Sequence, residues 1–352
     1  MYKYKLLNLL ILLSCSLFEA SAQIGFKNTY EFLSLPTSSR ITALGGNIVA
    51  MKDEDLNMAL ANPASANENH DGAIAFNHNF HFADIANGSF QMGKYFSKWG
   101  LSTHASFAYI NYGSFSLTDE FDVNSGTFNA SERALIIGGS KILNERLTAG
   151  INIKSIFSSL ESYKSFGLAS DLSLAYFNPE KNIAFNFLVK NLGGELRTYN
   201  TQRLSAPLDI QIGYSRKLRH LPLRFSVIAH QLQQWDIRYD DPNLNVNNNL
   251  FGENTEKSAF SKNIDNVFRH LIFNMELSMG SSGNFKIRGG YNHFRRKELS
   301  LSTFRSMAGF SFGVGIKIKQ FNLDYGLGYY HLAGANNHLS ILTNINRFKR
   351  KK

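Results

Sequence analysis

Two residues near the C-terminal end have the types and spacing for nucleophilic chemistry. His338 and Ser340 are separated by one residue in a segment of alternating apolar and polar side chains. Side chains at i and i+2 of a strand project from the same face, so His338 could take the hydroxyl proton of Ser340, as in a lipid hydrolase. No acid that would orient His338 lies nearby in the sequence. We therefore favour two polar residues at the rim of a sheet and predict that the chain is not an enzyme.

A second set of residues has the spacing of a calcium loop. Asp241, Asn243 and Asn245 occupy positions one, three and five, but position six is Val246 and position twelve is Gly252. An EF-hand needs Gly and Glu there, so that hypothesis fails. A looser calcium site remains an alternative to ordinary turn chemistry. Elsewhere the sequence has no His/Asp/Glu cluster with metal-ligand spacing and no phosphate loop, so we predict no cofactor.

The first 22 residues are interpreted as a signal peptide. Lys3 and Lys5 precede an apolar run, and Ala20 and Ala22 form an A-x-A cleavage site that leaves Gln23 as the first mature residue. The alternative is a lipoprotein signal in which Cys15 is lipidated and retained. If this only cysteine of the chain is removed, neither a disulfide framework nor a thiol nucleophile is possible.

The clearest structural pattern is a period-two alternation. Even positions from Ala308 to Ile318 are apolar, and odd positions from Phe321 to Tyr329 are apolar, with small or polar residues between them. Each stretch predicts a strand with one apolar face. The same reasoning predicts about fourteen strands, at 72–82, 86–96, 100–112, 131–142, 145–158, 166–178, 181–191, 207–218, 221–233, 267–280, 283–294, 306–319, 320–331 and 337–348.

Short and long gaps alternate between these strands. The short gaps are 97–99, 144, 179–180, 220 and 281–282, and the long ones are 113–130, 159–165, 192–206, 234–266 and 295–305. This alternation is typical of an all-β, antiparallel up-and-down β-barrel in a Gram-negative outer membrane. It places long loops outside the cell and both termini in the periplasm. The alternative is a soluble β-sandwich. No apolar stretch after residue 22 is long enough for a transmembrane helix.

Residues 23–71 precede the first predicted strand and lack sustained alternation. A ring of fourteen strands encloses more space than its own side chains fill. We therefore predict that this segment is a plug inside the barrel, with a short helix that the acids Asp53 to Asp55 begin and Pro63 ends. The alternative is a loose leader outside. The predicted domains are a signal peptide (1–22), a plug (23–71) and a barrel (72–352).

The predicted lumen face carries charges of both signs. Mixed signs favour a network that braces barrel and plug, whereas one sign would favour an ion pathway. The net charge of +10 is scattered along the chain apart from the basic tail 347–352, which argues against a nucleic-acid interface. The inward charges are Lys154, Asp171, Lys190, Asp209, Arg224, Glu276, Lys286, Arg288, Lys317 and Asp324.

Several motifs resemble a known family. In the plug these residues include Arg40, Leu44, Gly45, Gly46, Asp53, Asp55, Asn62 and Pro63, and further motifs are Gln234-Trp235-Asp236, Tyr239-Asp240-Asp241-Pro242 and Gly290-Tyr291-Asn292-His293. Together they resemble the PorQ family of outer-membrane proteins of the type IX secretion system. The small-residue, Gly-Gly and Asn-Pro-Ala pattern is also similar to the wider FadL-like barrel group.

The resemblance implies a fourteen-stranded barrel with an N-terminal hatch and a non-enzymatic role. Members of the family belong to an attachment complex with PorU, PorV and PorZ, in which they anchor PorZ while PorU joins cargo to anionic lipopolysaccharide. On this hypothesis the long loops dock the partner, with Trp235, Tyr239, Asp240, Asp241 and Asn243 as candidate contacts. The alternative function is FadL-like transport of a hydrophobic small molecule, which predicts an apolar pocket between plug and wall.

Overall fold

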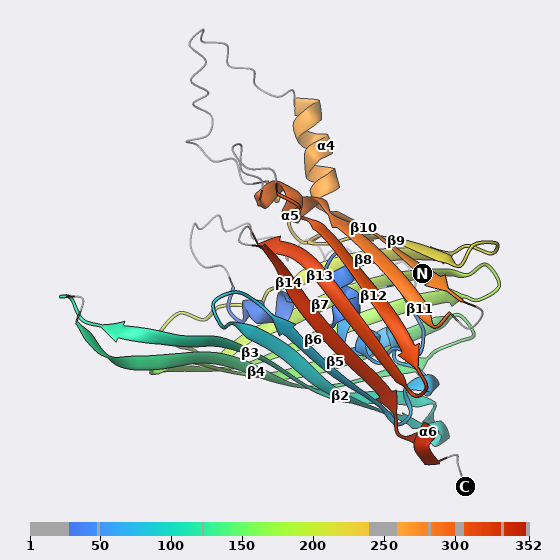
Figure 1. Ribbon diagram of the computed structural model, residues 1–352, viewed down its shortest axis with the longest axis horizontal. Coiled ribbons are helices and arrows are strands. Elements are labelled where there is room, and N and C mark those ends of the chain that lie inside the picture. Colours follow the sequence, from blue (N-terminus) through green and yellow to red (C-terminus); the bar gives the residue numbers. More distant parts are fainter. Residues whose placement is uncertain are drawn as a thin grey trace, which may run out of the picture.

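Fourteen antiparallel strands close into one barrel in the computed structural model (Figure 1). The structure describes residues 28–47, 50–121, 123–238, 259–280, 283–299, 306–331 and 334–349. Each strand pairs with its neighbours in the chain, and β1 closes the ring against β14 with Ala73 opposite Asn344. The predicted up-and-down barrel and its strand number are therefore confirmed.

The strands follow the predicted segments closely in position, although several differ in length. They are β1 Ala73–Phe80, β2 Ala86–Phe96, β3 Leu101–Thr118, β4 Asn124–Ile142, β5 Leu147–Leu160, β6 Tyr163–Asn178, β7 Ile183–Arg197, β8 Asp209–Lys217, β9 Leu223–Ala229, β10 Leu271–Met279, β11 Phe285–Asn292, β12 Phe310–Ile318, β13 Phe321–His331 and β14 Gly334–Asn344.

The helices are short. They are α2 Ser39–Ala43, α3 Asn57–Ala61, α4 Ala259–Arg269, α5 His293–Glu298 and α6 Asn346–Lys349, with 3-10 turns at Glu31–Ser34, Pro63–Ser65, Glu68–His70 and Ser97–Trp99. No helix in the described ranges is long and apolar enough to cross a membrane.

The two faces of the barrel wall have opposite character. In β12, Phe310 and Phe312 are exposed on the outside while Ser311 between them is fully buried toward the lumen. The same alternation recurs around the ring, so large apolar side chains such as Ile137 and Ile153 stand on the outer surface at 70% and 55% exposure. A continuous apolar exterior with a polar interior is the pattern of a barrel that faces lipid.

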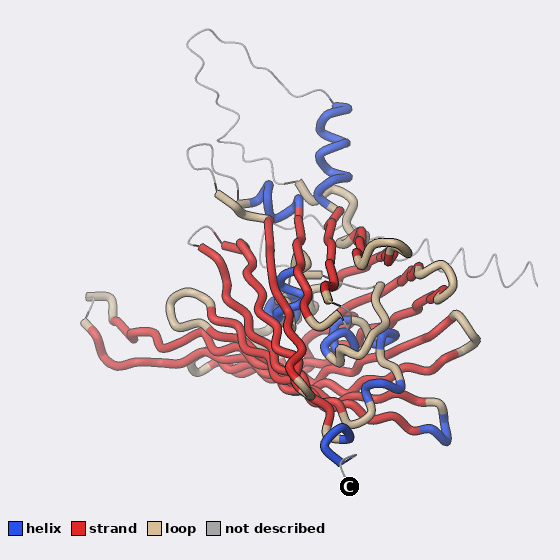
Figure 2. Tube along the Cα trace, turned by 45° about the vertical axis from the view of Figure 1, so that its right-hand side comes forward, coloured by secondary structure: helices blue, strands red, loops and turns tan. Residues whose placement is uncertain are grey.

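The N-terminal segment, which we define as residues 28–47 and 50–71, lies inside the ring of strands. Figure 2 shows its short helices surrounded by the wall. The segment is joined to strands far away in sequence: the Ser39 amide donates to Ser340 Oγ at 2.9 Å, and Ser140 Oγ donates to the Ala66 carbonyl at 2.7 Å. Asn28 forms a parallel bridge with Ser205 between β7 and β8.

The connections define two ends of the barrel. The short-turn end carries the connections β2–β3, β4–β5, β6–β7, β8–β9, β10–β11 and β12–β13, and the C-terminal α6. The long-loop end carries the others. Ser205 lies at the long-loop end, so Asn28 begins the described chain at the opposite end from α6.

Three predicted long loops are corrected. Most of 113–130 is strand, because β3 and β4 continue as a hairpin beyond the wall (Figure 1). The predicted loop 159–165 is a tight turn with Leu160 opposite Tyr163. β7 runs on to Arg197, which shortens the predicted loop 192–206, and its far edge is covered by the bridge between Gly194 and Ser205.

Several predicted strand ends are helical or irregular instead. Residues 267–269 belong to α4 and residues 293–294 to α5, while α6 replaces the end of the last predicted strand. β9 ends at Ala229, because the Asp209 carboxylate accepts from the Gln231 amide at 2.7 Å and takes the chain out of the β8–β9 ladder.

Candidate functional site

Arg40 is the centre of the most strongly charged site in the described chain. Its guanidinium is 1% exposed and reaches three carboxylates: Asp53 at 2.7 Å, Asp55 at 3.1 Å and Glu276 at 2.8 Å. Asp53 and Asp55 belong to the N-terminal segment, and Glu276 belongs to β10. A buried guanidinium needs this many acceptors, because an unpaired buried charge is very costly.

Glu276 connects Arg40 to the barrel wall. It accepts from Arg40 Nε and from Arg288 Nε, both at 2.8 Å, and Arg288 also pairs with Asp324 of β13. Register explains the alignment, since Glu276 lies opposite Arg288 on one side and opposite Arg224 on the other. The network therefore ties the segment to β10, β11 and β13, as expected from the mixed signs of the lumen charges.

Local structure places Arg40 and its partners. Ser38 caps α2 by accepting from the Ile41 amide at 3.4 Å, and Gly45 and Gly46 end the helix at φ +88° and +92°. These left-handed positions favour glycine. The Asp55 carboxylate accepts from the Asn57 amide at 3.0 Å at the start of α3. The acids predicted only to begin a helix therefore also bind Arg40.

The two aspartates respond to this site in opposite ways. Burial alone would favour the neutral acid of Asp53, but Arg40, with Arg224 and Lys286 further away, holds the pKa of Asp53 below its usual value. Burial raises the pKa of Asp55, and the adjacent charge of Asp53 adds to that rise. Arg40 therefore stabilises the ionised form of Asp53, which lies at 2.7 Å, more than that of Asp55, which lies at 3.1 Å.

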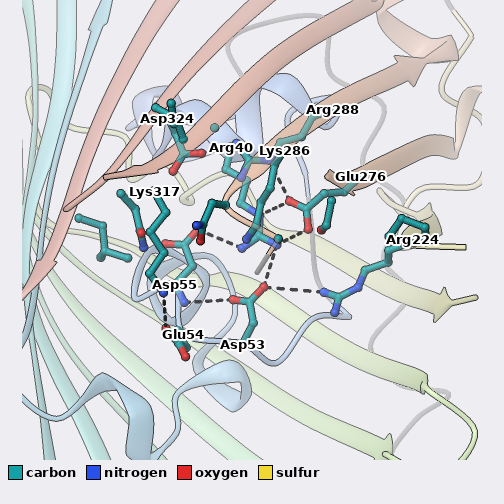
Figure 3. A pocket seen from close by; sticks show the side chains of 18 of the residues that line it. Arg40, Asp53, Glu54, Asp55, Arg224, Glu276, Lys286, Arg288, Lys317 and Asp324 are labelled. Carbon is teal, nitrogen blue, oxygen red and sulfur yellow. Dashed lines mark hydrogen bonds and ion pairs between the residues drawn. The ribbon is translucent and has the colours of Figure 1, made fainter. Parts of the chain in front are cut away.

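A cavity of 490 Å³ adjoins this network at the short-turn end (Figure 3). It is bounded by the segment at Arg40 and Asp53 and by β8 to β14. Figure 3 shows Arg224, Lys286 and Lys317 extending from the wall toward the segment's carboxylates. We call this cavity the charged basin.

An apolar cluster lies on the opposite wall of the lumen. Phe32, Leu33 and Leu60 of the segment pack against Ile110, Ile136 and Ile156, which point inward from β3, β4 and β5. A small pocket of 30 Å³ lies beside Leu35 and Ala108, with Lys154 and Lys190 also among its lining residues. Lys154 forms a fully buried ion pair with Asp171 at 2.7 Å. Apolar residues facing a barrel lumen are unusual, because lumens are commonly polar.

His338 and Ser340 are brought to the lumen but not to each other. His338 Nδ1 lies 2.9 Å from Thr42 Oγ1, and Ser340 Oγ accepts from the Ser39 amide. Asp324 is opposite Ser340 in the register, yet it pairs with Arg288 and not with His338. Both residues hold α2, and no triad forms in the described part of the chain.

The remaining motif residues of the segment have structural contacts. Leu44 is fully buried, and a Cβ at Gly45 would meet Ile272 at 2.6 Å. A Cβ at Gly46 would meet Arg295 at 2.8 Å. Asn62 Oδ1 accepts from the Ala64 amide at 3.1 Å and from Ser173, and Pro63 begins the next 3-10 turn.

The predicted docking residues are only partly described. Trp235 is 66% exposed, stacks on His270 with ring centroids 5.5 Å apart, and its carbonyl accepts from Asn266 at 2.6 Å. Tyr239, Asp240, Asp241 and Asn243 lie outside the described residues, as do Asn245, the cleavage-site residues Ala20, Ala22 and Gln23, and Cys15. Within the described ranges no cluster of three or more potential ligands could hold a metal.

Sequence reasoning missed two features of the site. The pairing of Arg40 with Asp53 and Asp55 had a signal only in their types, since nothing in the spacing indicates that the chain folds back between them. The inward isoleucines of β3 to β5 did have a signal, because Ile110, Ile136 and Ile156 are apolar at positions that alternate with the lipid-facing residues.

Comparison with solved structures supports the barrel. The chain is similar to the "TodX monoaromatic hydrocarbon channel deltaS2 mutant", with 12% identity, a TM-score of 0.51, and 88% of this chain and 97% of that chain covered. It also matches the "CymD monoaromatic hydrocarbon channel" at 10% identity and a TM-score of 0.48, covering 88% and 96%. No protein-family model and no curated protein sequence matches. At these identities, the TodX likeness establishes a shared fold.

Proposed function

We propose that this protein is an outer-membrane, FadL-like channel for a small apolar molecule, with the N-terminal segment closing its lumen. The observation that carries the proposal is the apolar cluster between Phe32, Leu33 and Leu60 and the inward isoleucines of the wall. A molecule that partitions out of water would find there an apolar contact surface of the kind that its transfer needs.

If the protein is such a channel, the described conformation is its closed state. The pocket beside the cluster has 30 Å³, far below the roughly 300 Å³ at which ligand pockets begin. A ring-sized solute therefore passes only after Leu35 and its neighbours move. Because the buried Arg40 network holds the rest of the segment, we assign this movement to the stretch from Tyr30 to Thr37.

The test is uptake of a labelled monoaromatic hydrocarbon, such as toluene, by cells that express the protein in a deletion background. Ala108→Trp fills the pocket and should slow uptake several-fold, whereas Ala105→Trp, on the lipid face of the same strand, should leave it unchanged. Equal uptake by the deletion strain and its parent would contradict the proposal.

A second candidate is the non-enzymatic scaffold of a type IX secretion attachment complex that anchors PorZ, with PorU and PorV as further partners. The sequence motifs favour it, and so does one structural observation: the β3–β4 hairpin projects beyond the wall with Phe121 and Val123 exposed at 84% and 58%. Exposed apolar side chains on a projecting hairpin are suited to a protein partner.

Two strains test the scaffold. Deleting the gene should release PorZ from the cell surface, and so should a variant in which a two-residue turn replaces residues 114–129 while the barrel is kept. PorZ that stays on the surface of the deletion strain would rule the scaffold out. Loss of PorZ with normal hydrocarbon uptake in the hairpin variant would separate the two functions.

A further inference from the structure

The charged basin has the size and position of a ligand site. Its 490 Å³ falls within the range of small-molecule pockets. It is bordered by the turns at Pro222, Gly280 and Gly283, which places its opening at the short-turn end. The basin is separate from the apolar cluster, which lies against β3 to β5.

The space arises from the register of the wall. Lys286 of β11 lies between Ser278 of β10 and Gly315 of β12, so both of its inward neighbours are small. The space beside Gly315 is occupied by the charged network, since a Cβ there would collide with Asp324 Oδ1 and would meet Arg288 Nη1 at 2.9 Å. Ser278 and Gly315 line the basin together with Lys286, which extends from the wall into the lumen (Figure 3).

The residues that line the basin carry more positive than negative charge. Five carboxylates line the basin, namely Asp53, Glu54, Asp55, Glu276 and Asp324, against six cations, namely Arg40, Lys217, Arg224, Lys286, Arg288 and Lys317. A seventh cation, Arg347, binds Glu54 at 2.8 Å from outside the lining. The carboxylates are thus neutralised with two positive charges to spare.

The spare charge can be assigned to residues. Arg40 and Arg288 bind four of the carboxylates between them. Among the described residues, Lys286 and Lys217 form no ion pair, and Arg224 approaches Asp53 only at 3.7 Å, beyond hydrogen-bond distance. Arg224 Nη1 is buried with no hydrogen-bond partner. Arg224 and Lys286 therefore have donors that a ligand oxygen would satisfy.

We propose that the charged basin binds a phosphate-type oxyanion between Arg224 and Lys286, with Lys217 at its rim. A phosphate group presents several oxygens within a small volume, so it can accept from a guanidinium and an ammonium at once. Lys217 lies opposite Arg224 in the register, which puts the third cation at the same opening. The proposal does not depend on channel or scaffold function.

The test is calorimetric titration of the purified full-length protein in a zwitterionic, phosphate-free detergent at pH 7.5, with sodium phosphate as ligand and sodium chloride at matched ionic strength as reference. We expect saturable phosphate binding that weakens at least tenfold in the double variant Arg224→Gln/Lys286→Gln. Lys98→Gln, in the β2–β3 turn at the same end, is the control and should bind as the parent does.

Folding of each variant is checked by the mobility shift between boiled and unboiled samples in SDS. No saturable heat, or equal affinity in the parent and in a folded double variant, would overturn the site. The source of the phosphate is resolved by native mass spectrometry from nanodiscs. Selective retention of phosphatidylglycerol over phosphatidylcholine, lost in the double variant, identifies a lipid headgroup, and phosphate heat without lipid retention identifies a free solute.

Discussion

At the scale of single residues, the fold of the N-terminal segment depends on one buried cation. Arg40 serves two carboxylates of its own segment and one of the wall, so it fixes both the internal fold of the segment and its position. An arginine suits this position because its planar guanidinium spreads five donors over three nitrogens, whereas a lysine has three donors on one atom.

Arg40→Met should therefore loosen the segment without opening the barrel. It leaves Asp53, Asp55 and Glu276 facing one another in a buried site, which costs about 3–5 kcal/mol. We expect a lower midpoint of thermal unfolding and new tryptic cleavage within residues 50–71. Arg219→Met, at the exposed β8–β9 turn, is the matched control and should match the parent in both measurements.

His70 gives the segment a pH dependence of known sign. Burial lowers the pKa of His70, which accepts from the Asn67 amide at 3.4 Å and lies 3.1 Å from the Asp53 carbonyl. The unfolded chain takes up a proton below about pH 6.5 and the folded chain resists it, so stability is full above that pH and falls as the pH drops.

Between pH 7.5 and 5.5 the parent should therefore lose more stability than His70→Gln, because the lowered pKa of folded His70 makes the folded chain bind fewer protons than the unfolded chain. Urea unfolding in detergent at the two pH values measures the difference, which isolates His70 from the other titrating groups. An identical pH response in the two proteins would show that the pKa of His70 does not differ between the folded and unfolded chains.

At the scale of elements, α2 packs against strands whose facing positions include glycines. A Cβ at Gly290 of β11 would collide with the backbone of Leu44 and Gly45, and one at Gly326 of β13 with the carbonyl of Ser39. Glycine is required at these positions because two backbones approach closely, not because of a turn.

Neighbouring glycines of β11 provide a sharp test of this packing. Gly290→Leu should expel α2 and expose Arg40 to trypsin, because the lumen side has no room. Gly289→Leu points to the outer face, where a Cβ meets Met275 at an ordinary 3.6 Å, and should leave Arg40 protected. Equal protection in both variants would mean that α2 has a second way to pack.

The elements that sequence reasoning found are those with a strong periodicity. β2 has the predicted bounds, since both of its faces have a defined environment. The distal part of β3 and β4 was missed because its alternation is short: only Phe115 and Leu117 are apolar between Ser114 and Thr118. Cross-strand pairing and the stack of Phe115 on Phe128 maintain the ribbon there. α4 was divided between a predicted loop, 234–266, and a predicted strand, 267–280, although Phe260, Ile264, Val267 and Phe268 have helical spacing.

At the scale of the whole molecule, the apolar exterior makes the stability of the barrel depend on contact with lipid. Ile153 lies midway along β5 and is 55% exposed, so Ile153→Arg would place a charge against acyl chains at a cost of about 2–4 kcal/mol. We expect a smaller folded fraction in lipid vesicles, measured by the SDS mobility shift.

The control introduces an arginine at a position outside the lipid-facing wall. Phe121 is 84% exposed at the tip of the β3–β4 hairpin, and Phe121→Arg should insert as well as the parent. If both variants insert equally, the barrel exterior does not face lipid at Ile153; if both fail, the hairpin tip is immersed as well.

The hairpin also makes one rim of the molecule unlike the rest. Beyond Asn111 and Ala130, where β2 and β5 stop pairing, β3 and β4 continue as a two-stranded ribbon for about 20 Å, given the rise of a strand. It bends at Gly113, whose φ is +86°. If this end faces outward, as the alternation of short and long gaps predicts, an epitope placed on the arm becomes accessible to antibody on an unbroken cell without covering the barrel mouth beside it.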